Sequence, residues 1–184
     1  MPSLKNIELI IGNSGRNFSG GTSITIQLLG YQVKEMNLAV LGLRFIPTQY
    51  KTINYLQFLS LTRRKLPNGK PRVFYTRKNN EMIQGLIAKY IFGAKIKIIF
   101  SSSAQRDHTK FTKWLMSKMD SIVSTSRKAG NYLNKEPDKI ISHGIDLNRF
   151  SPPEDKDKAW QILGFPGSIG IGIFGRVRYS KGID

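Results

Sequence analysis

Short apolar runs alternate with longer amphipathic segments along this chain, and that alternation constrains the fold more than any other feature. The segments between the runs carry apolar residues at helical spacing, as Met82, Leu86 and Tyr90 do. Such alternation predicts an α/β protein whose parallel sheet has helices on both faces. The predicted strands, each rich in Ile, Val, Leu or Phe, are residues 7–11, 38–43, 72–75, 96–100, 121–125 and 139–141.

A change of composition near residue 150 predicts a domain boundary. Two prolines, Pro152 and Pro153, are followed by the charged residues 154–158. The sequence therefore predicts a first domain over residues 1–150, and over 151–184 a linker with the start of a second domain. Residues 169–174 look like a buried strand, and residues 182–184 like the first turn of a helix, so we expect the chain to be a fragment.

The charge balance is strongly basic, at +17 overall. Residues 51–118 hold fifteen of the cations and only two carboxylates, Glu81 and Asp107, which gives this window +13. Such a field attracts nucleic acid, an anionic membrane surface or a phosphorylated substrate, although it is also compatible with a solvated basic surface. Charge alone does not choose among these.

The length of the apolar runs, the first residues of the chain and its Cys and His content further limit the class of protein to which it can belong. No run approaches the roughly 18 apolar residues of a membrane-spanning helix, and no secretory signal peptide is visible at the start. The chain has no Cys, which fits a cytoplasmic location. Its two histidines are too far apart in sequence for a zinc site, so we predict no metal.

Two glycine-containing turns follow predicted strands and suit a phosphate. Gly175 would let the chain turn after residues 169–174, where Arg176 and Lys181 can direct cations at one anion. Gly20 and Gly21 would lie at a helix N-terminus, where free N–H groups favour an anion. The alternatives are a solvated basic loop at the first place and a plain tight turn at the second.

Polar residues also follow the strands at 72–75 and 96–100. Arg77 and Glu81 come after the first of these strands, and Arg106 and His108 after the second. Open α/β sheets bind ligands at this end of their strands. Alternatively, Glu81 only complements a helix dipole and His108 only hydrogen-bonds at a helix start.

The predicted helix at residues 110–119 mixes lysines with aromatic residues. If its aromatic side chains are exposed, such a helix suits an anionic lipid surface. The alternative is that Trp114 packs into the core.

Several motifs together resemble a known enzyme family. His143-Gly144-Ile145-Asp146-x-x-x-Phe150-x-Pro152, followed by Gly175-Arg176-x-Arg178-x-x-Lys181-Gly182, resembles the interdomain segment and second-domain entrance of the retaining family 4 glycosyltransferases. Three further motifs look like the lipopolysaccharide-core mannosyltransferase branch: Arg77-x-Asn79-x-Glu81-Met82, Ser101-Ser102-Ser103-Ala104-Gln105-Arg106-x-His108-Thr109 and Trp114-Leu115-x-x-x-Met119-Asp120.

The resemblance implies a GT-B fold: a Rossmann-like parallel sheet as the N-terminal domain, plus the first strand and helix of a second Rossmann-like domain. It implies a hexosyltransferase that moves a hexose, with mannose favoured, from a nucleotide-sugar to a lipopolysaccharide core. The donor, GDP-mannose or a UDP-hexose, would be a substrate, and no cofactor is implied. The acceptor would be a lipid A-linked core sugar at the cytoplasmic face of the inner membrane, with the enzyme peripheral on that anionic surface and no nucleic acid expected as a partner.

The resemblance also implies roles for individual residues. Arg176 and Lys181 would clamp the donor diphosphate, with Gly20 and Gly21 approaching it across the cleft. On the acceptor side, the lining residues would be Arg77, Glu81, Arg106 and His108. Many members carry a histidine directly after the strand that ends here at Phe100; this chain has Ser101 there, and the nearest histidine is His108. The resemblance therefore assigns no catalytic residue and leaves His108 as a candidate.

Because the family's donor-binding glutamates lie beyond Asp184, we expect this chain alone to be inactive. The alternative from a different class is a basic α/β module that binds nucleic acid or an anionic membrane without catalysis. An inert remnant of a split gene is a third possibility.

Overall fold

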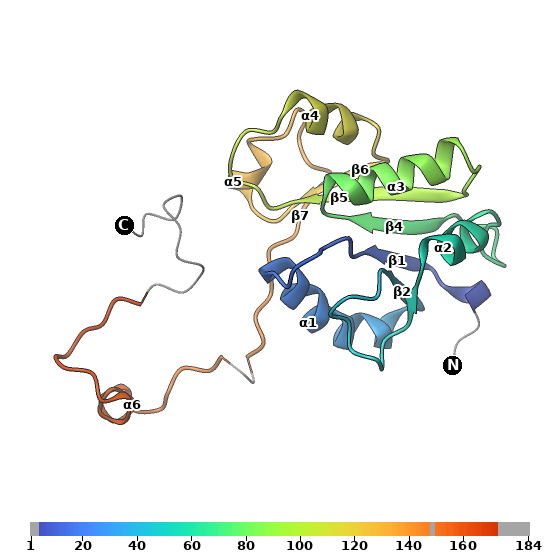
Figure 1. The fold of residues 1–184 in the computed structure, drawn as a ribbon. Helices are drawn as coiled ribbons and strands as arrows, with labels where there is room; N and C mark the ends of the chain where they lie inside the picture. Colours follow the sequence, from blue (N-terminus) through green and yellow to red (C-terminus); the bar gives the residue numbers. More distant parts are fainter. Residues whose placement is uncertain (1–3, 148–149, 173–184) are drawn as a thin grey trace. The chain divides into compact units, whose positions relative to one another are not determined.

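The computed structural model describes residues 4–147 and 150–172 (Figure 1). Contacts divide the chain into two compact units, Met1–Gly144 and Ile145–Asp184. The first unit holds a parallel sheet with the strand order β3-β2-β1-β4-β5-β6-β7. This order reverses between β1 and β4, as it does in Rossmann-like folds.

All six predicted strands of the first domain are present within about two residues of their expected bounds. The strands are β1 (Leu9–Gly12), β2 (Leu38–Leu41), β3 (Thr52–Ile53), β4 (Arg72–Thr76), β5 (Ile96–Ser102), β6 (Ser121–Ser124) and β7 (Lys139–Ile140). The helices are α1 (Gly20–Glu35), α2 (Tyr55–Thr62), α3 (Asn79–Tyr90), α4 (Lys110–Ser117), α5 (Arg127–Gly130) and α6 (Lys156–Leu163), after a 3-10 turn at Leu4–Asn6. The strand that the sequence missed, β3, has only two residues, too few to show a pattern.

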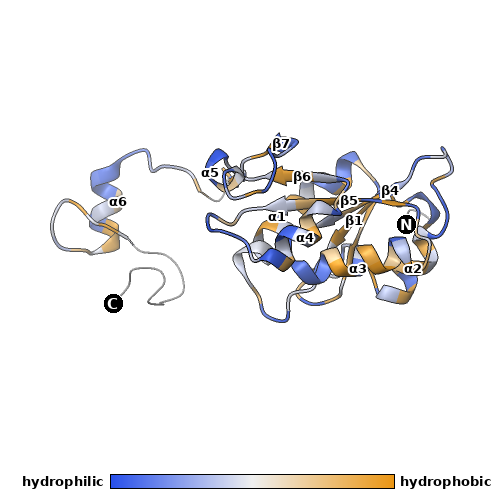
Figure 2. Ribbon diagram, turned by 90° about the horizontal axis from the view of Figure 1, so that it is seen from above, coloured by the Kyte–Doolittle hydropathy of each residue, from blue (hydrophilic) through white to orange (hydrophobic). Residues whose placement is uncertain are grey.

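Two apolar clusters fix the layers of the first unit. The larger one joins β1, β4 and β5 to α2, α3 and α4 through fully buried side chains such as Phe58, Phe74 and Met82. Figure 2 shows these three helices along one side of the strands. The smaller cluster packs Leu29 of α1 against Ile11 and Val40 on the other side of the sheet. Alternate strand residues thus supply both cores, as expected for a parallel sheet buried on both faces.

Because the strands are parallel, the two edges of the sheet differ chemically. We call the edge where β1, β4, β5 and β6 end the carboxyl edge, and the edge where they begin the amino edge. Polar loops leave the carboxyl edge, and the loops after β1 and β4 run into α1 and α3. The residues that the sequence predicted as a site in this domain follow β1, β4 and β5, so they belong to the carboxyl edge.

The second unit contains α6, which Asp155 caps by accepting from the N–H groups of Asp157 and Lys158. The predicted buried strand at residues 169–174 is not seen where the structure describes it. Residues 169–172 form no strand, and Ile169 and Ile171 are 84% and 94% exposed. A strand needs a hydrogen-bonded neighbour, and the described residues supply none here. Residues 173–184, with Arg176 and Lys181, lie outside the described residues.

No helix within residues 4–147 or 150–172 has the length and apolar character needed to cross a membrane.

Candidate functional site

A polar pocket of about 240 Å³ lies at the carboxyl edge, where β4 and β5 end. The two strands determine where this pocket lies, because the residues at and after their ends form its walls. It contains three of the four residues predicted on the acceptor side, Arg77, Arg106 and His108. The complete lining is Arg77, Asn79, Phe100, Ser101, Ser102, Ser103, Ala104, Arg106, His108 and Thr112.

Two helix N-termini open onto this pocket. The first residue of α3, Asn79, donates from its side-chain nitrogen to the Thr112 hydroxyl of α4 at 2.8 Å. Thr109, the N-cap of α4, lies 3.0 Å from the same hydroxyl and accepts the Thr112 N–H. No side chain caps α3. The linked helix starts therefore turn N–H groups and positive dipole ends toward the pocket, which favours an anion.

Arg77 extends from the end of β4 and bridges the switch point between β1 and β4. Its guanidinium donates to the Gly21 carbonyl at 2.7 Å and to the Gly12 carbonyl at 3.3 Å. Its Nε is buried without a hydrogen-bond partner in the described part of the chain. No carboxylate among the described residues pairs with it, so its positive charge is available to a ligand.

Glu81 does not line the pocket and is fully buried. One carboxyl oxygen accepts from the Ser14 N–H at 3.1 Å and the Ser14 hydroxyl at 3.0 Å. The other accepts from the Arg77 N–H at 2.7 Å. Glu81 therefore ties the loop after β1 to the start of the loop after β4, which positions Arg77.

Gly12 faces this carboxyl group at very close range. A Cβ built on Gly12 would lie 2.9 Å from the Glu81 Cγ and 3.0 Å from its Cδ. The end of β1 thus needs a glycine so that the Glu81 side chain can pass beneath the loop.

His108 lies on the pocket wall, with its Nε2 3.4 Å from the Ser102 hydroxyl. Burial lowers the pKa of His108, and the cations Lys113 and Arg106 lower it further, against an opposing effect of Asp107. The imidazole is therefore neutral at pH 7. A neutral ring can accept a hydrogen bond from a sugar hydroxyl.

Gly20 and Gly21 begin α1, as the sequence predicted. The Ser19 side chain caps this helix by accepting the Thr22 N–H. A Cβ added to Gly20 would meet nothing within 4 Å. The space above the first turn is open, whereas the Gly21 carbonyl is already bound to Arg77.

Sequence reasoning missed two parts of this site. Ser14 is 67 positions from Glu81, and no local pattern announces their contact. The contact between Asn79 and Thr112 spans 33 positions and also depends on tertiary packing. For Thr109 a signal existed, since a threonine just before a helix is a preferred N-cap.

The described residues contain no group of three or more His, Cys, Asp or Glu that could hold a metal ion. The positively charged side chains that line the pocket are Arg77 and Arg106.

Two curated relatives align with the entire chain. The lipopolysaccharide core biosynthesis mannosyltransferase LpcC of Rhizobium leguminosarum bv. viciae is 37% identical over 185 residues. The corresponding LpsB of Rhizobium meliloti (strain 1021) is 37% identical over 187 residues. Each alignment covers 52% of the relative, so the chain spans about half the length of the curated relatives it matches. No protein-family model matches the chain.

Solved structures share the fold. Anabaena Alr3699/HepE in complex with UDP superposes with a TM-score of 0.62 at 13% identity, and its complex with UDP and glucose gives 0.59. Each match covers 86% of this chain and 50% of the other. Along its whole length the chain is thus similar to lipopolysaccharide-core mannosyltransferases, and it shares the fold of half of the HepE chain, which confirms the resemblance and the Rossmann-like parallel sheet predicted from the motifs.

Proposed function

We propose that residues 1–144 form the acceptor-side domain of a hexosyltransferase. The complete enzyme would transfer a hexose, with mannose favoured, from a nucleotide-sugar, GDP-mannose or a UDP-hexose, to a lipid A-linked core sugar. Two findings support this: the names of the curated relatives, and HepE's binding of UDP in a similar fold. The acceptor lies at the cytoplasmic face of the inner membrane in this proposal, and the enzyme is peripheral there.

The observation that carries the proposal is the pocket at the carboxyl edge. It joins the charge of Arg77 and Arg106 to the N-termini of α3 and α4. Such a pocket suits an anionic group, a phosphate or a carboxylate, on the acceptor. We assign Arg106 to that anionic group, and His108 to a neighbouring sugar hydroxyl.

The other predicted residues of this domain take different roles in the proposal. Gly20 leaves open space at the start of α1, where the donor diphosphate can approach. Glu81 does not contact the acceptor in this proposal, because its carboxyl group is buried. It instead holds Arg77 and Ser14 in position through hydrogen bonds.

Departure of a nucleoside diphosphate leaves negative charge that cations must stabilise. We keep Arg176 and Lys181 as the proposed clamp for that charge. Clamping by side chains makes a metal ion unnecessary for this step.

A transfer assay tests the proposal. Because the chain spans half of its relatives' length, the assay uses a chimera in which residues 1–184 precede the C-terminal half of LpcC. We expect transfer of labelled mannose from GDP-mannose to a lipid A-linked core acceptor. Replacing Arg176→Ala together with Lys181→Ala should abolish it. Unchanged turnover in that double variant would reject the clamp, and a chimera that folds but transfers no hexose from any nucleotide-sugar would reject the function.

His108→Asn separates two roles for the imidazole. General base catalysis is worth about 10²–10⁴-fold in kcat, and its loss should also remove the acidic limb of the pH–rate profile. A change in acceptor KM with kcat preserved would instead assign His108 to binding.

A further inference from the structure

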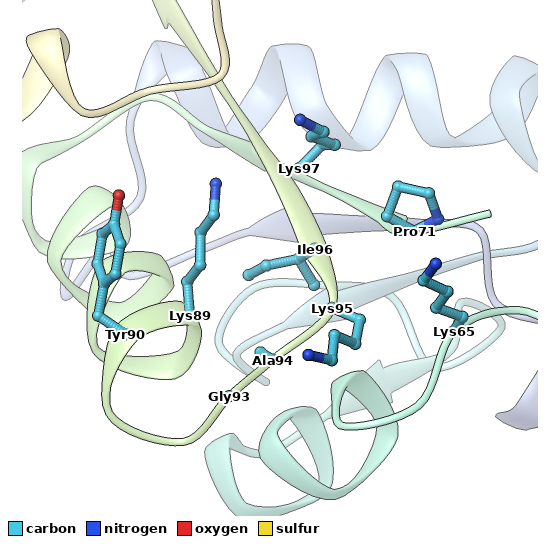
Figure 3. A pocket seen from close by; sticks show the side chains of 9 residues that line it. All are labelled: Lys65, Pro71, Lys89, Tyr90, Gly93, Ala94, Lys95, Ile96 and Lys97. Atoms are coloured by element: carbon cyan, nitrogen blue, oxygen red, sulfur yellow. The ribbon is translucent and has the colours of Figure 1, made fainter. Parts of the chain in front are cut away.

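The amino edge of the sheet carries a second hollow, which is lined by lysines (Figure 3). Its volume is about 410 Å³, and it lies where β5 begins, beside the end of α3 and the segment between α2 and β4. Four lysines contribute to its lining, Lys65, Lys89, Lys95 and Lys97. Because the strands are parallel, this hollow is at the opposite edge from the candidate site.

The hollow keeps a net positive charge. Lys89 and Lys97 both pair with Asp120, at 2.7 and 3.0 Å. Lys65 and Lys95 are exposed and make no ion pair within the described ranges. Four cations thus face one carboxylate.

An apolar turn borders the same hollow. Tyr90, Ile91 and Phe92 follow one another at the end of α3 and are 67%, 72% and 47% exposed. Tyr90 also lines the hollow itself (Figure 3). A contiguous group of exposed apolar side chains is typical of a protein–protein or membrane interaction site.

The backbone fixes this exposure. The Ile91 N–H still donates to the Ile87 carbonyl at 2.9 Å, and the Ala94 N–H then reaches back to the Ala88 carbonyl at 2.9 Å. Gly93 closes the turn with a φ of +66°, which favours glycine. The Lys95 N–H donates to the Thr62 carbonyl at 2.7 Å, which ties the turn to the end of α2. The turn therefore holds its apolar side chains outward.

We propose that the Tyr90–Phe92 turn, together with Lys65 and Lys95, docks the protein on an anionic phospholipid surface. Apolar side chains enter the boundary between headgroups and acyl chains, while the lysines contact lipid phosphates. Because the surface is positively charged, we expect it to bind anionic lipid in preference to neutral lipid. The inference goes beyond the proposed function: this surface lies at the edge of the sheet opposite to the acceptor pocket, so it would hold the protein on the membrane without contacting that pocket.

Helix α4 offers the competing surface and a matched control. Phe111 and Trp114 are 54% and 53% exposed, with their rings stacked 6.0 Å apart, so the alternative that Trp114 packs into the core is wrong. The lysine between them in sequence, Lys113, is already paired with Asp107 at 2.8 Å. We place the docking surface at the turn after α3, where three consecutive exposed apolar side chains adjoin the lysine-lined hollow, and use α4 for comparison.

Sedimentation of the 184-residue protein with vesicles tests the proposal. The vesicles contain phosphatidylcholine with or without phosphatidylglycerol, and the partition coefficient is measured. Ile91→Ser with Phe92→Ser should lower it at least about tenfold on anionic vesicles. Lys65→Gln with Lys95→Gln should lower it about 25-fold, since each lysine contributes about fivefold. The control, Phe111→Ser with Trp114→Ser, should retain most binding.

Three results would overturn the docking surface: an equal or larger loss in the α4 control, equal binding to vesicles of phosphatidylcholine alone, or tighter binding to duplex DNA than to vesicles at the same salt concentration. Circular dichroism should show all variants folded, because every substituted side chain is exposed. The vesicles contain neither donor nor acceptor. Vesicle binding without hexose transfer would thus contradict only the proposed function, and transfer without vesicle binding only the docking surface.

Discussion

The two edges of the parallel sheet use polar residues in opposite ways. At the carboxyl edge, the Glu81 and Asn79 side chains form hydrogen bonds with other parts of the protein. These bonds fix the shape of a pocket. At the amino edge, Lys65 and Lys95 extend into solvent without ion pairs in the described residues. The carboxyl edge is thus organised by hydrogen bonds within the protein, whereas the amino edge exposes positive charge to the solvent. Substitutions that break the internal bonds of the first should cost stability, whereas substitutions of the exposed lysines at the second should cost binding.

Glu81→Ala should break this contrast most strongly. It leaves the Ser14 N–H and the Arg77 N–H without their buried acceptor, which we expect to cost about 3 kcal/mol of the free energy of unfolding. Urea unfolding measures it. Glu136→Ala, an exposed carboxylate in the same unit, is the control and should change little. A loss below about 1 kcal/mol for Glu81→Ala would mean that the network does not organise the carboxyl edge.

A pair of glycines sharpens the same contrast. Gly12→Ala should cost about 1–3 kcal/mol, because its Cβ would collide with the Glu81 side chain. Gly20→Ala meets open space and should be neutral or slightly stabilising, since alanine favours a helix. Thermal unfolding of both variants checks this order. Equal losses would show that close packing beneath Gly12 is not what makes this edge sensitive.

Asp120 is the exception at the amino edge, because its carboxyl group is used internally. Burial raises the pKa of Asp120, but hydrogen bonds from Lys89, the Ile98 N–H and Lys97 together hold it below its ordinary value of 3.8. Ionised Asp120 therefore adds stability above that value, and the contribution is lost as the pH falls through the lowered pKa.

Asp120→Asn should thus cost about 1 kcal/mol at pH 7, and the difference from the unsubstituted protein should shrink below pH 3.8. Chemical unfolding across this pH range measures the difference. If it stays constant with pH, the ion pairs with Lys89 and Lys97 do not contribute.

Much of the fold could be predicted, since each long strand is an apolar run between polar turns. The carboxyl-edge position of Arg77, Arg106 and His108 followed from the rule that parallel strands end at one edge. The role of Glu81 did not follow, because its partner Ser14 lies far away in sequence. The expected strand at residues 169–174 rested on composition alone, and a strand also needs a neighbour.

The smallest expected effect is on the stability of the lysine variants. Lys65→Gln with Lys95→Gln should change the free energy of unfolding by less than about 0.5 kcal/mol, because both side chains are exposed. Differential scanning calorimetry measures it. A clear destabilisation would mean that these lysines hold the fold together, which would remove the contrast between the two edges.

The central claim is that the pocket at the carboxyl edge binds an anionic acceptor. The most direct test measures KM for acceptor and for nucleotide-sugar separately in the chimera, with and without Arg106→Ala. We predict that the acceptor KM rises about tenfold while the donor KM stays unchanged, since a lost charge-assisted contact is worth about 1.4 kcal/mol or more. A rise in the donor KM alone, or no change in either, would contradict the claim.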